Sequence, residues 1–204
     1  MAEQLIITLG REFGSGGHEI ARRLAERFSL PLLEENMLRH IAEEKGLNPE
    51  RMERYDEAPR TRVFYRTVNG FSNAPEDVIA EMQFQYLRDR AAAGDSFVVG
   101  GRCAEEGLKD YPGRVSIFVL ADRWFKVQRT MARGAIPESE ALELMSRRDR
   151  KRKSYHNQYC KGKWGDSRSY DLCINSAKLG IQGTVDLLER YIRDRVHTMR
   201  PVEE

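Results

Sequence analysis

One stretch of the chain has a composition that indicates a specific chemistry, the glycine-rich segment GREFGSGGHEI at residues 10–20. Four glycines fall within eight positions, directly after the apolar run LIITL and directly before an amphipathic stretch. A glycine-rich turn between a strand and a helix exposes backbone N–H groups, and the helix N-terminus adds a partial positive charge. Such a turn can bind a phosphate. The candidate phosphate-binding residues are Gly14, Ser15, Gly16, Gly17 and His18.

The segment lacks the lysine of the common phosphate-binding loop, whose pattern is G-x-x-x-x-G-K-[ST]. With the second glycine of the pattern at Gly16, the lysine position holds Gly17 and the hydroxyl position holds His18. With the first glycine at Gly10, the second glycine position holds Ser15 and the lysine position holds Gly16. Two interpretations stay open: a phosphate-binding loop without its main cation, and a tight strand-to-helix turn without a ligand. The glycine density favours the first, since a turn usually needs only one or two residues with positive φ.

Arginines are the candidate cations for this loop. Arg11 lies inside it, Arg102 follows an apolar run, and Arg148 and Arg152 belong to the basic run at 147–153. An arginine fork matches phosphate geometry, so these arginines are candidate ligands of a bound phosphate. The alternatives are a surface arginine that caps a helix, for Arg102, and a solvated helix face, for the basic run.

The elements that must position these residues alternate in type. Strand-like apolar runs are each followed by a helical pattern, which favours a parallel sheet covered on both faces. We expect a helix between an N-cap at Asp122 and a stop at Gly134, and a closing helix over 184–196. The expected strands lie at 5–9, 30–33, 96–101, 114–120 and 170–175.

Two stretches interrupt this alternation. Residues 34–95 are mainly helical with no clear strand, and prolines mark helix starts at 48–49 and 73–75. Residues 137–163 are helical and strongly basic. These patterns predict one helical insertion between the second and third strands and a second helical segment that concentrates positive charge.

Length and composition set the remaining expectations. A chain of 204 residues suits one domain over 1–204, and a net charge of +2 argues against a general nucleic-acid binder. Cys103, Cys160 and Cys173 form no C-x-x-C pair, so we expect neither a zinc site nor any other metal site. An odd cysteine count without a signal peptide favours a reducing cytoplasm. No apolar run approaches the about 20 residues that span a bilayer, so we expect no membrane partner.

Three segments together resemble the cytidylate kinase-like family, a branch near the nucleoside monophosphate kinases. They are ITLGREFGSGGHEIARRLAERFSLPLLEENML, FVVGGRCAEEGLKDYPGRVSIFVLADRWFKVQRTMAR, and the stretch from RRDRKRK to GTVDLL. The resemblance covers almost the whole chain, and the part that matches least is 48–75. It implies a three-layer α/β P-loop kinase fold with five parallel strands in the order 2-3-1-4-5. It also implies a helical acceptor-binding insertion at about 34–95 and a basic helical lid at about 137–165.

The same resemblance implies transfer of the γ-phosphoryl group of ATP, with Mg²⁺, to a nucleoside monophosphate such as CMP. Phosphoryl transfer needs cations around a charge that is spread over the equatorial oxygens, so we take Arg11, Arg148 and Arg152 as candidate catalytic residues. Arg102 occupies the position of the arginine that meets the acceptor, and Asp149 is assigned to the acceptor site because it could orient an arginine or a sugar hydroxyl. Two other functions stay open: a catalytically impaired nucleotide sensor or regulatory protein, and a kinase for a non-nucleotide small acceptor. A homodimer is compatible with all three.

Overall fold

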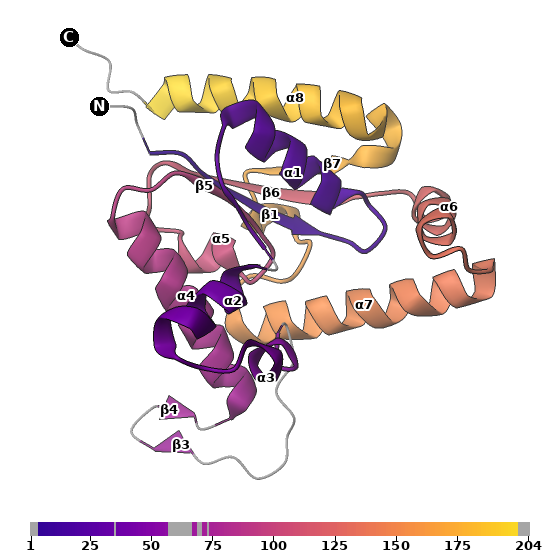
Figure 1. The fold of residues 1–204 in the computed structure, drawn as a ribbon. Coiled ribbons are helices and arrows are strands. Elements are labelled where there is room, and N and C mark those ends of the chain that lie inside the picture. Colours follow the sequence, from indigo (N-terminus) through magenta and orange to yellow (C-terminus); the bar gives the residue numbers. More distant parts are fainter. Residues whose placement is uncertain (1–3, 35, 57–66, 69–70, 73, 200–204) are drawn as a thin grey trace.

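The computed structural model describes residues 4–34, 36–56, 67–68, 71–72 and 74–199. Its centre is a parallel five-stranded sheet with helices on both faces (Figure 1). The strand order is β2-β5-β1-β6-β7, which is 2-3-1-4-5 when the five strands are counted along the chain, so the predicted fold is confirmed. The strands are β1 (Ile6–Arg11), β2 (Leu32–Leu33), β5 (Phe97–Gly100), β6 (Arg114–Leu120) and β7 (Leu172–Asn175).

Strand β1 lies in the middle of the sheet and all six of its residues are buried. A strand covered on both faces needs apolar side chains on both, which explains the unbroken run rather than an alternating pattern. Its register pairs Leu9 with Gly100 of β5 and Gly10 with Phe118 of β6. The carboxyl ends of these strands therefore meet at one edge of the sheet. Ligands of open α/β folds bind outside this edge.

Two groups of helices cover the sheet. Helix α1 (Gly17–Phe28) and helix α8 (Ser176–Met199) lie side by side on one face, as Figure 1 shows. Helices α2 (Asn36–Lys45), α4 (Pro75–Ala92) and α5 (Ala104–Gly107) pack on the other face with β2 and β5. Helix α8 begins earlier than the predicted 184, because a non-helical Gly180 with φ 67° joins a short first segment to the main helix.

Helices α6 (Arg123–Gly134) and α7 (Glu138–Tyr159) pack against each other, and Figure 1 shows α7 below the sheet, on the side away from α1 and α8. Helix α6 has the predicted N-cap residue Asp122 and the predicted last residue Gly134. The Asp122 carboxylate does not cap the helix, because it pairs with Lys178 and accepts a hydrogen bond from Asn175. Helix α7 contains the whole basic run. The rest of the predicted lid, residues 160–165, contains no helix or strand, and a 3₁₀ turn at Ser167–Ser169 follows it.

The insertion after β2 contains α2, α3 (Pro49–Glu53) and α4, so its mainly helical character is as predicted. Asn48 caps α3 by accepting a hydrogen bond from the Arg51 N–H, and α4 begins at Pro75. The expectation of no strand is wrong, since Thr67–Val68 (β3) pairs with Phe71–Ser72 (β4) in antiparallel fashion. Strands of two residues are too short to produce a hydropathy pattern. Residues 57–66, 69–70 and 73 lie outside the described part.

No helix of the described residues is both long enough and apolar enough to cross a membrane.

Candidate functional site

The segment between β1 and α1 forms a tight loop at the carboxyl edge of the sheet. Gly14 (φ 78°) and Gly16 (φ 82°) adopt the left-handed conformation, and Gly16 is the N-cap of α1. The Ser15 hydroxyl donates to the Glu12 carbonyl at 2.8 Å, and the Ser176 hydroxyl donates to the Ser15 carbonyl at 2.5 Å. These bonds fix the loop at the start of α1, whose first N–H groups have no partner inside the helix and receive no side-chain cap. A helix N-terminus of this kind can bind an anion, which makes the loop a candidate phosphate site.

A hollow of about 990 Å³ opens in front of this loop. Eight cationic and five acidic side chains line it, which gives a formal charge of +3 with histidine neutral. A cleft with an excess of one charge concentrates ligands of the opposite sign. The cationic side chains are those of Arg11, Arg22, Arg102, Arg129, Arg133, Arg148, Lys151 and Arg152, and the acidic ones are those of Glu12, Glu19, Glu34, Glu53 and Asp56.

The structure brings eight of the ten candidate residues from the sequence together around this hollow. The two that do not line it are Ser15, which is fully buried in the loop, and Asp149. The eight that do are Arg11, Gly14, Gly16, Gly17, His18, Arg102, Arg148 and Arg152.

Asp149 of α7 contacts the loop backbone instead. Its carboxylate accepts a hydrogen bond from the Phe13 N–H at 2.6 Å and lies 3.7 Å from Lys126 Nζ. Burial raises the pKa of Asp149, although the Phe13 hydrogen bond and the Lys126 charge oppose this shift. Lys126 also lies 2.9 Å from Glu12 Oε2. A lysine that sequence reasoning did not single out therefore lies beside the loop, between two carboxylates.

Two arginines of α6 were also not identified as candidate site residues in the sequence analysis. Arg129 and Arg133 are four residues apart, which places them on one face of the helix, and both line the hollow. The Arg129 guanidinium carbon lies 3.3 Å from the position that a Cβ would take at Gly16. Its Nη2 atom lies 2.5 Å from Glu19, and this hydrogen bond lowers the pKa of the Glu19 carboxyl. This spacing was a usable signal, because the expected strand at 114–120 and N-cap at Asp122 already place the start of the helix at the carboxyl edge of the sheet.

Arg11 and His18 share one acidic partner, the buried Glu34. Arg11 Nη2 lies 3.6 Å from Glu34 Oε1, and His18 Nδ1 contacts Glu34 Oε2. A Cβ at Gly100 would overlap the Glu34 carboxylate, so the glycine at the end of β5 makes room for this group. The charge of Arg11 is thus directed toward Glu34 as well as toward the hollow.

Arg102 also lines the hollow and is paired with a residue of the insertion. It is 6% exposed, donates to the Gly100 carbonyl at 3.2 Å, and lies 2.6 Å from Asp56 Oδ2. Lys151 of α7 donates to the Asp56 carbonyl at 2.9 Å. Arg102 and its neighbour Cys103 have φ values of 58° and 53°, a conformation that costs a side-chain-bearing residue about 1–2 kcal/mol. The Arg102 guanidinium therefore projects from a strained turn and is held by its contacts with Gly100 and Asp56.

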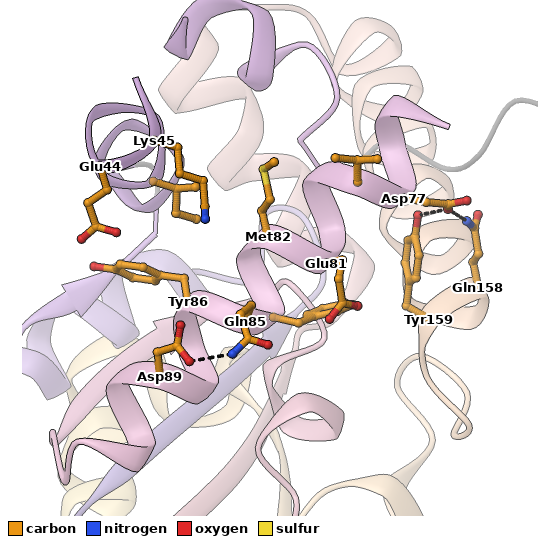
Figure 2. Close-up of a pocket in the computed structure, with 13 residues that line it drawn as sticks. Glu44, Lys45, Asp77, Glu81, Met82, Gln85, Tyr86, Asp89, Gln158 and Tyr159 are labelled. Atoms are coloured by element: carbon orange, nitrogen blue, oxygen red, sulfur yellow. Dashed lines mark hydrogen bonds between the residues drawn. The ribbon is translucent and has the colours of Figure 1, made fainter. Parts of the chain in front are cut away.

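A second hollow of about 930 Å³ lies between α2, α4 and the end of α7 (Figure 2). Met82 and Tyr86 of α4 line it, and hydrogen bonds join Gln85 to Asp89 and Tyr159 to Asp77. Its lining, as far as the structure describes the chain, includes no residue of the loop at 10–18. The similar size of the two hollows does not decide between them. The glycine-rich loop and the arginines single out the first as the candidate site.

Comparison with known proteins agrees with this geometry. A family model described as "Cytidylate kinase-like family" matches residues 6–178. A cytidylate kinase of Methanococcus vannielii is 25% identical over 193 residues, which cover 93% of this chain and 100% of that protein. An uncharacterized protein from Eubacterium ventriosum has a crystal structure with a TM-score of 0.74, 38% identity, and coverage of 93% of this chain and 99% of that one.

The fold has a more distant relative as well. A shikimate kinase from Bacteroides thetaiotaomicron matches with a TM-score of 0.54 and 12% identity, covering 93% of this chain and 98% of that one. At this identity the likeness shows the shared P-loop kinase fold alone.

Proposed function

This chain belongs to the cytidylate kinase-like family, and from that premise we propose that it transfers the γ-phosphoryl group of ATP to a nucleoside monophosphate, CMP being the first candidate. The observation that carries the proposal is the glycine-rich loop at the N-terminus of α1, which faces a hollow lined by eight cationic side chains. An uncharged ligand would gain little from such a lining, whereas two phosphorylated substrates would gain much.

In this proposal Gly14, Ser15, Gly16, Gly17 and His18 form the phosphate-binding segment. The N–H groups at the start of α1 would bind the phosphates of ATP, since a helix N-terminus supplies both donors and partial positive charge. Ser15 would act through the loop backbone, because its hydroxyl is buried and donates to the Glu12 carbonyl.

The charge that a phosphate-loop lysine normally supplies would come from arginines of other elements. Arg148 and Arg152 on α7 and Arg11 on β1 all line the hollow. Arg129 of α6 joins them as the guanidinium that lies against Gly16. Lys126 is less suited to this role, because it is not among the residues that line the hollow and its ammonium group lies between the carboxylates of Glu12 and Asp149. Transition-state charge would then be stabilised by guanidinium groups from three elements.

The acceptor would bind on the side of Arg102. This guanidinium lies at the end of β5, where α7 and the insertion meet through Lys151 and Asp56. A buried arginine fork is suited to a phosphate or carboxylate group. Asp149 would act indirectly, by positioning the Phe13 backbone of the loop, rather than by contacting a sugar hydroxyl.

Mg²⁺ would enter with ATP and would be bound by phosphate oxygens. The oxygens of the loop do not fit a direct metal ligand role as they stand. The Glu12 carboxylate is engaged by Lys126 and by the Ala121 N–H, and the Ser15 hydroxyl is buried. We assign no protein ligand to this ion.

The test is a screen of acceptors with Mg-ATP and purified protein, in which ADP release and the phosphorylated product are both measured. We expect a nucleoside monophosphate to be phosphorylated. The Arg129→Ala variant should be about tenfold to hundredfold slower, as the loss of a charge-assisted hydrogen bond predicts. Arg190→Ala is the matched control, because this arginine is 87% exposed on α8 and pairs only with the nearby Asp194 among the described contacts.

The other outcomes identify the alternatives. ATP binding without transfer to any acceptor would favour the nucleotide sensor, for which the absence of a lysine at Gly17 and His18 is the supporting observation. Transfer only to a phosphate-free or non-nucleotide acceptor would favour a kinase for a non-nucleotide small acceptor. Failure to bind ATP would contradict all three.

A further inference from the structure

A thiol lies beside a histidine and a carboxylate where the end of α7 meets α5. Cys160 is the C-cap of α7, and His156 lies one turn earlier on the same helix. Their spacing of four residues places both side chains on one face. Glu105 belongs to α5, and one oxygen, nitrogen or sulfur atom of each of the three side chains lies within 4.8 Å of the other two. The fold thus brings a nucleophile, an imidazole and a carboxylate together from segments that are distant in the chain.

His156 links the other two groups. Its Nε2 atom lies 2.6 Å from Glu105 Oε1, and the Tyr170 hydroxyl lies 3.3 Å from the same nitrogen. Its Nδ1 atom is buried and, among the described residues, forms no hydrogen bond with an oxygen or nitrogen atom. This nitrogen is left for the thiol of Cys160, which is a hydrogen-bond partner of His156. The contacts therefore run from thiol to imidazole to carboxylate.

The surroundings of this group favour an imidazolium and a thiolate. Although burial opposes the charged imidazole, the contacts with Cys160 and Glu105 raise the pKa of His156 to about 10. Hydrogen bonding with Cys103, and then with His156, lowers the pKa of the Cys160 thiol against the opposing effects of burial and of the Glu105 charge. The thiolate is the nucleophilic form of cysteine. The group therefore favours the reactive form of Cys160 at neutral pH.

Other elements enclose the group with both apolar and charged side chains. Cys160 packs against a buried cluster that contains Ala80 of α4 and Tyr155 of α7. His156 and Glu105 line a cavity of about 20 Å³ that three guanidinium groups also line, and their positive charge favours an anion nearby. The remaining titratable and charged groups around the thiol and the imidazole are Arg11, Arg102, Cys103, Arg152 and Tyr170.

We propose that Cys160 is a nucleophilic thiolate, activated by His156, and that it is a site of reversible thiolation by small disulfides. Glu105 is the positioning residue that holds the imidazole. The Cys160 sulfur attacks one sulfur of the disulfide and forms a new S–S bond, while the old S–S bond breaks and its electron pair leaves with the other sulfur. The released thiolate takes a proton from water. Cys160 is thereby oxidised, and the leaving half of the disulfide is reduced.

This inference goes beyond the proposed kinase activity and does not depend on it. Glu105, His156 and Cys160 are not among the residues assigned to phosphate or acceptor binding. The reactivity of the thiol can therefore be measured without ATP or an acceptor.

Cys173 provides a control within the same chain. Cys160 and Cys173 are both free and both partly exposed. Cys173 lies on β7, where burial and then the charge of Asp166 raise the pKa of its thiol. The two thiols therefore differ in the direction of their pKa shifts while both remain accessible.

The test follows alkylation of the reduced full-length protein by iodoacetamide from acid to alkaline pH, with peptide mass spectrometry to measure each cysteine separately. We expect the midpoint of the pH–rate profile at Cys160 to lie below that at Cys173. An unactivated thiol is only a few per cent thiolate at neutral pH, so Cys160 should react about tenfold faster there than Cys173. With glutathione disulfide we expect one glutathionyl adduct per chain, at Cys160, which a reducing agent removes.

Variants separate activation of the thiol from its exposure. His156→Gln should move the Cys160 midpoint to higher pH and slow alkylation at neutral pH about tenfold, while the rate at the alkaline plateau remains. Glu105→Gln should move the midpoint in the same direction by a smaller amount. Tyr170→Phe is the matched control, because it removes a hydroxyl beside the same nitrogen but no charge, and should move the midpoint least. An unchanged profile at Cys173 shows that each variant has folded.

The proposal is overturned if Cys160 of the wild type is not alkylated, or if its midpoint is not below that of Cys173. It is also overturned if folded His156→Gln keeps the wild-type midpoint at Cys160, and Glu105→Gln decides in the same way if His156→Gln does not fold. Alkylation of Cys160 that is fast only after treatment with a chelator would overturn it as well, because the cluster would then be a metal site.

Discussion

The Asp149 carboxylate accepts a hydrogen bond from the backbone N–H of Phe13 at 2.6 Å, across 136 residues of the chain. The bond ties the middle of α7 to the loop that we propose as the phosphate site. Lys126 lies between Asp149 and Glu12 and balances part of their charge. A loop that has no lysine of its own is thus held from outside by a carboxylate and a lysine of two other helices. The position of Asp149 should matter both for stability and for the loop.

Asp149→Asn should raise the unfolding temperature at neutral pH and should have no such effect in acid. Burial raises the pKa of this carboxyl, so the folded protein binds the proton more readily than the unfolded chain. Wild-type stability therefore falls, relative to the variant, as pH rises from the unfolded pKa of about 3.9 through the raised folded pKa. Above the folded pKa the difference in stability between wild type and Asp149→Asn is constant. Thermal unfolding across this range measures it.

Asp186→Asn is the control for this experiment. Its side chain is 54% exposed on α8 and pairs with Arg27 at the surface. A stability difference between wild type and Asp149→Asn that does not change with pH would contradict the assigned ionisation of Asp149.

Gly17→Ala should destabilise the protein, although alanine is normally the better helix residue. A Cβ at Gly17 would lie 2.5 Å from Arg11 Cβ and 3.0 Å from Arg11 Cγ, and the backbone of a buried strand cannot easily yield. Overpacking of this kind costs about 1–3 kcal/mol. In Gly107→Ala the new Cβ would meet only Phe84 at 3.9 Å, so this helical glycine should tolerate alanine or gain stability. Urea unfolding compares the two, and equal effects would refute the close packing of the loop.

Arg102→Ala should reduce use of the acceptor far more than binding of ATP. The loss of a charge-assisted hydrogen bond costs about 1.5–3 kcal/mol, or roughly tenfold to hundredfold. Steady-state kinetics with varied acceptor, together with calorimetric titration of ATP, separate the two effects. Asp56→Asn is the control, because it removes the charge that pairs with Arg102 but keeps the guanidinium. Equal losses for acceptor and ATP in Arg102→Ala would make Arg102 a structural residue.

Much of the fold could be predicted because it depends on local patterns. The apolar runs at 5–9 and 114–120 are long, and both became strands in the middle of the sheet. The strand order came from the family resemblance and not from periodicity. The β3–β4 pair and the early start of α8 were missed, because two-residue strands and the break at Gly180 leave no periodic pattern.

The candidate site was only partly predictable, because several of its contacts link distant segments. The expected strand at 114–120 and N-cap at Asp122 placed Arg129 and Lys126 on a helix that starts at the carboxyl edge, but nothing in the sequence indicated that this helix contacts the loop at 10–18. Asp149 was expected beside the acceptor, and nothing in the sequence around it indicates a bond to Phe13. The partnership of Arg11 with Glu34 depends on Gly100, which leaves space for the carboxylate.

The absent loop lysine leads to the last prediction, which concerns Arg152. Backbone N–H groups can hold ground-state phosphate, but they carry only partial charges, and only interactions that strengthen in the transition state raise the chemical rate. Arg152 lines the hollow, donates to the Arg11 carbonyl at 3.4 Å, and lies 5.8 Å from the Phe13 ring. The Arg11 carbonyl and the Phe13 ring thus hold this guanidinium beside the loop.

The chemical rate of Arg152→Ala should therefore be about tenfold to hundredfold lower than that of wild type, while most of the ATP affinity remains. Arg152→Lys should recover part of the rate, because it keeps the charge but not the fork that matches phosphate geometry. Single-turnover kinetics at saturating Mg-ATP give the chemical rate, and equilibrium titration gives the affinity. Lys153→Ala is the matched control, because Lys153 is the next residue of the same helix and its cationic side chain is exposed. If Arg152→Ala is as fast as Lys153→Ala, the Arg152 guanidinium does not replace the missing lysine.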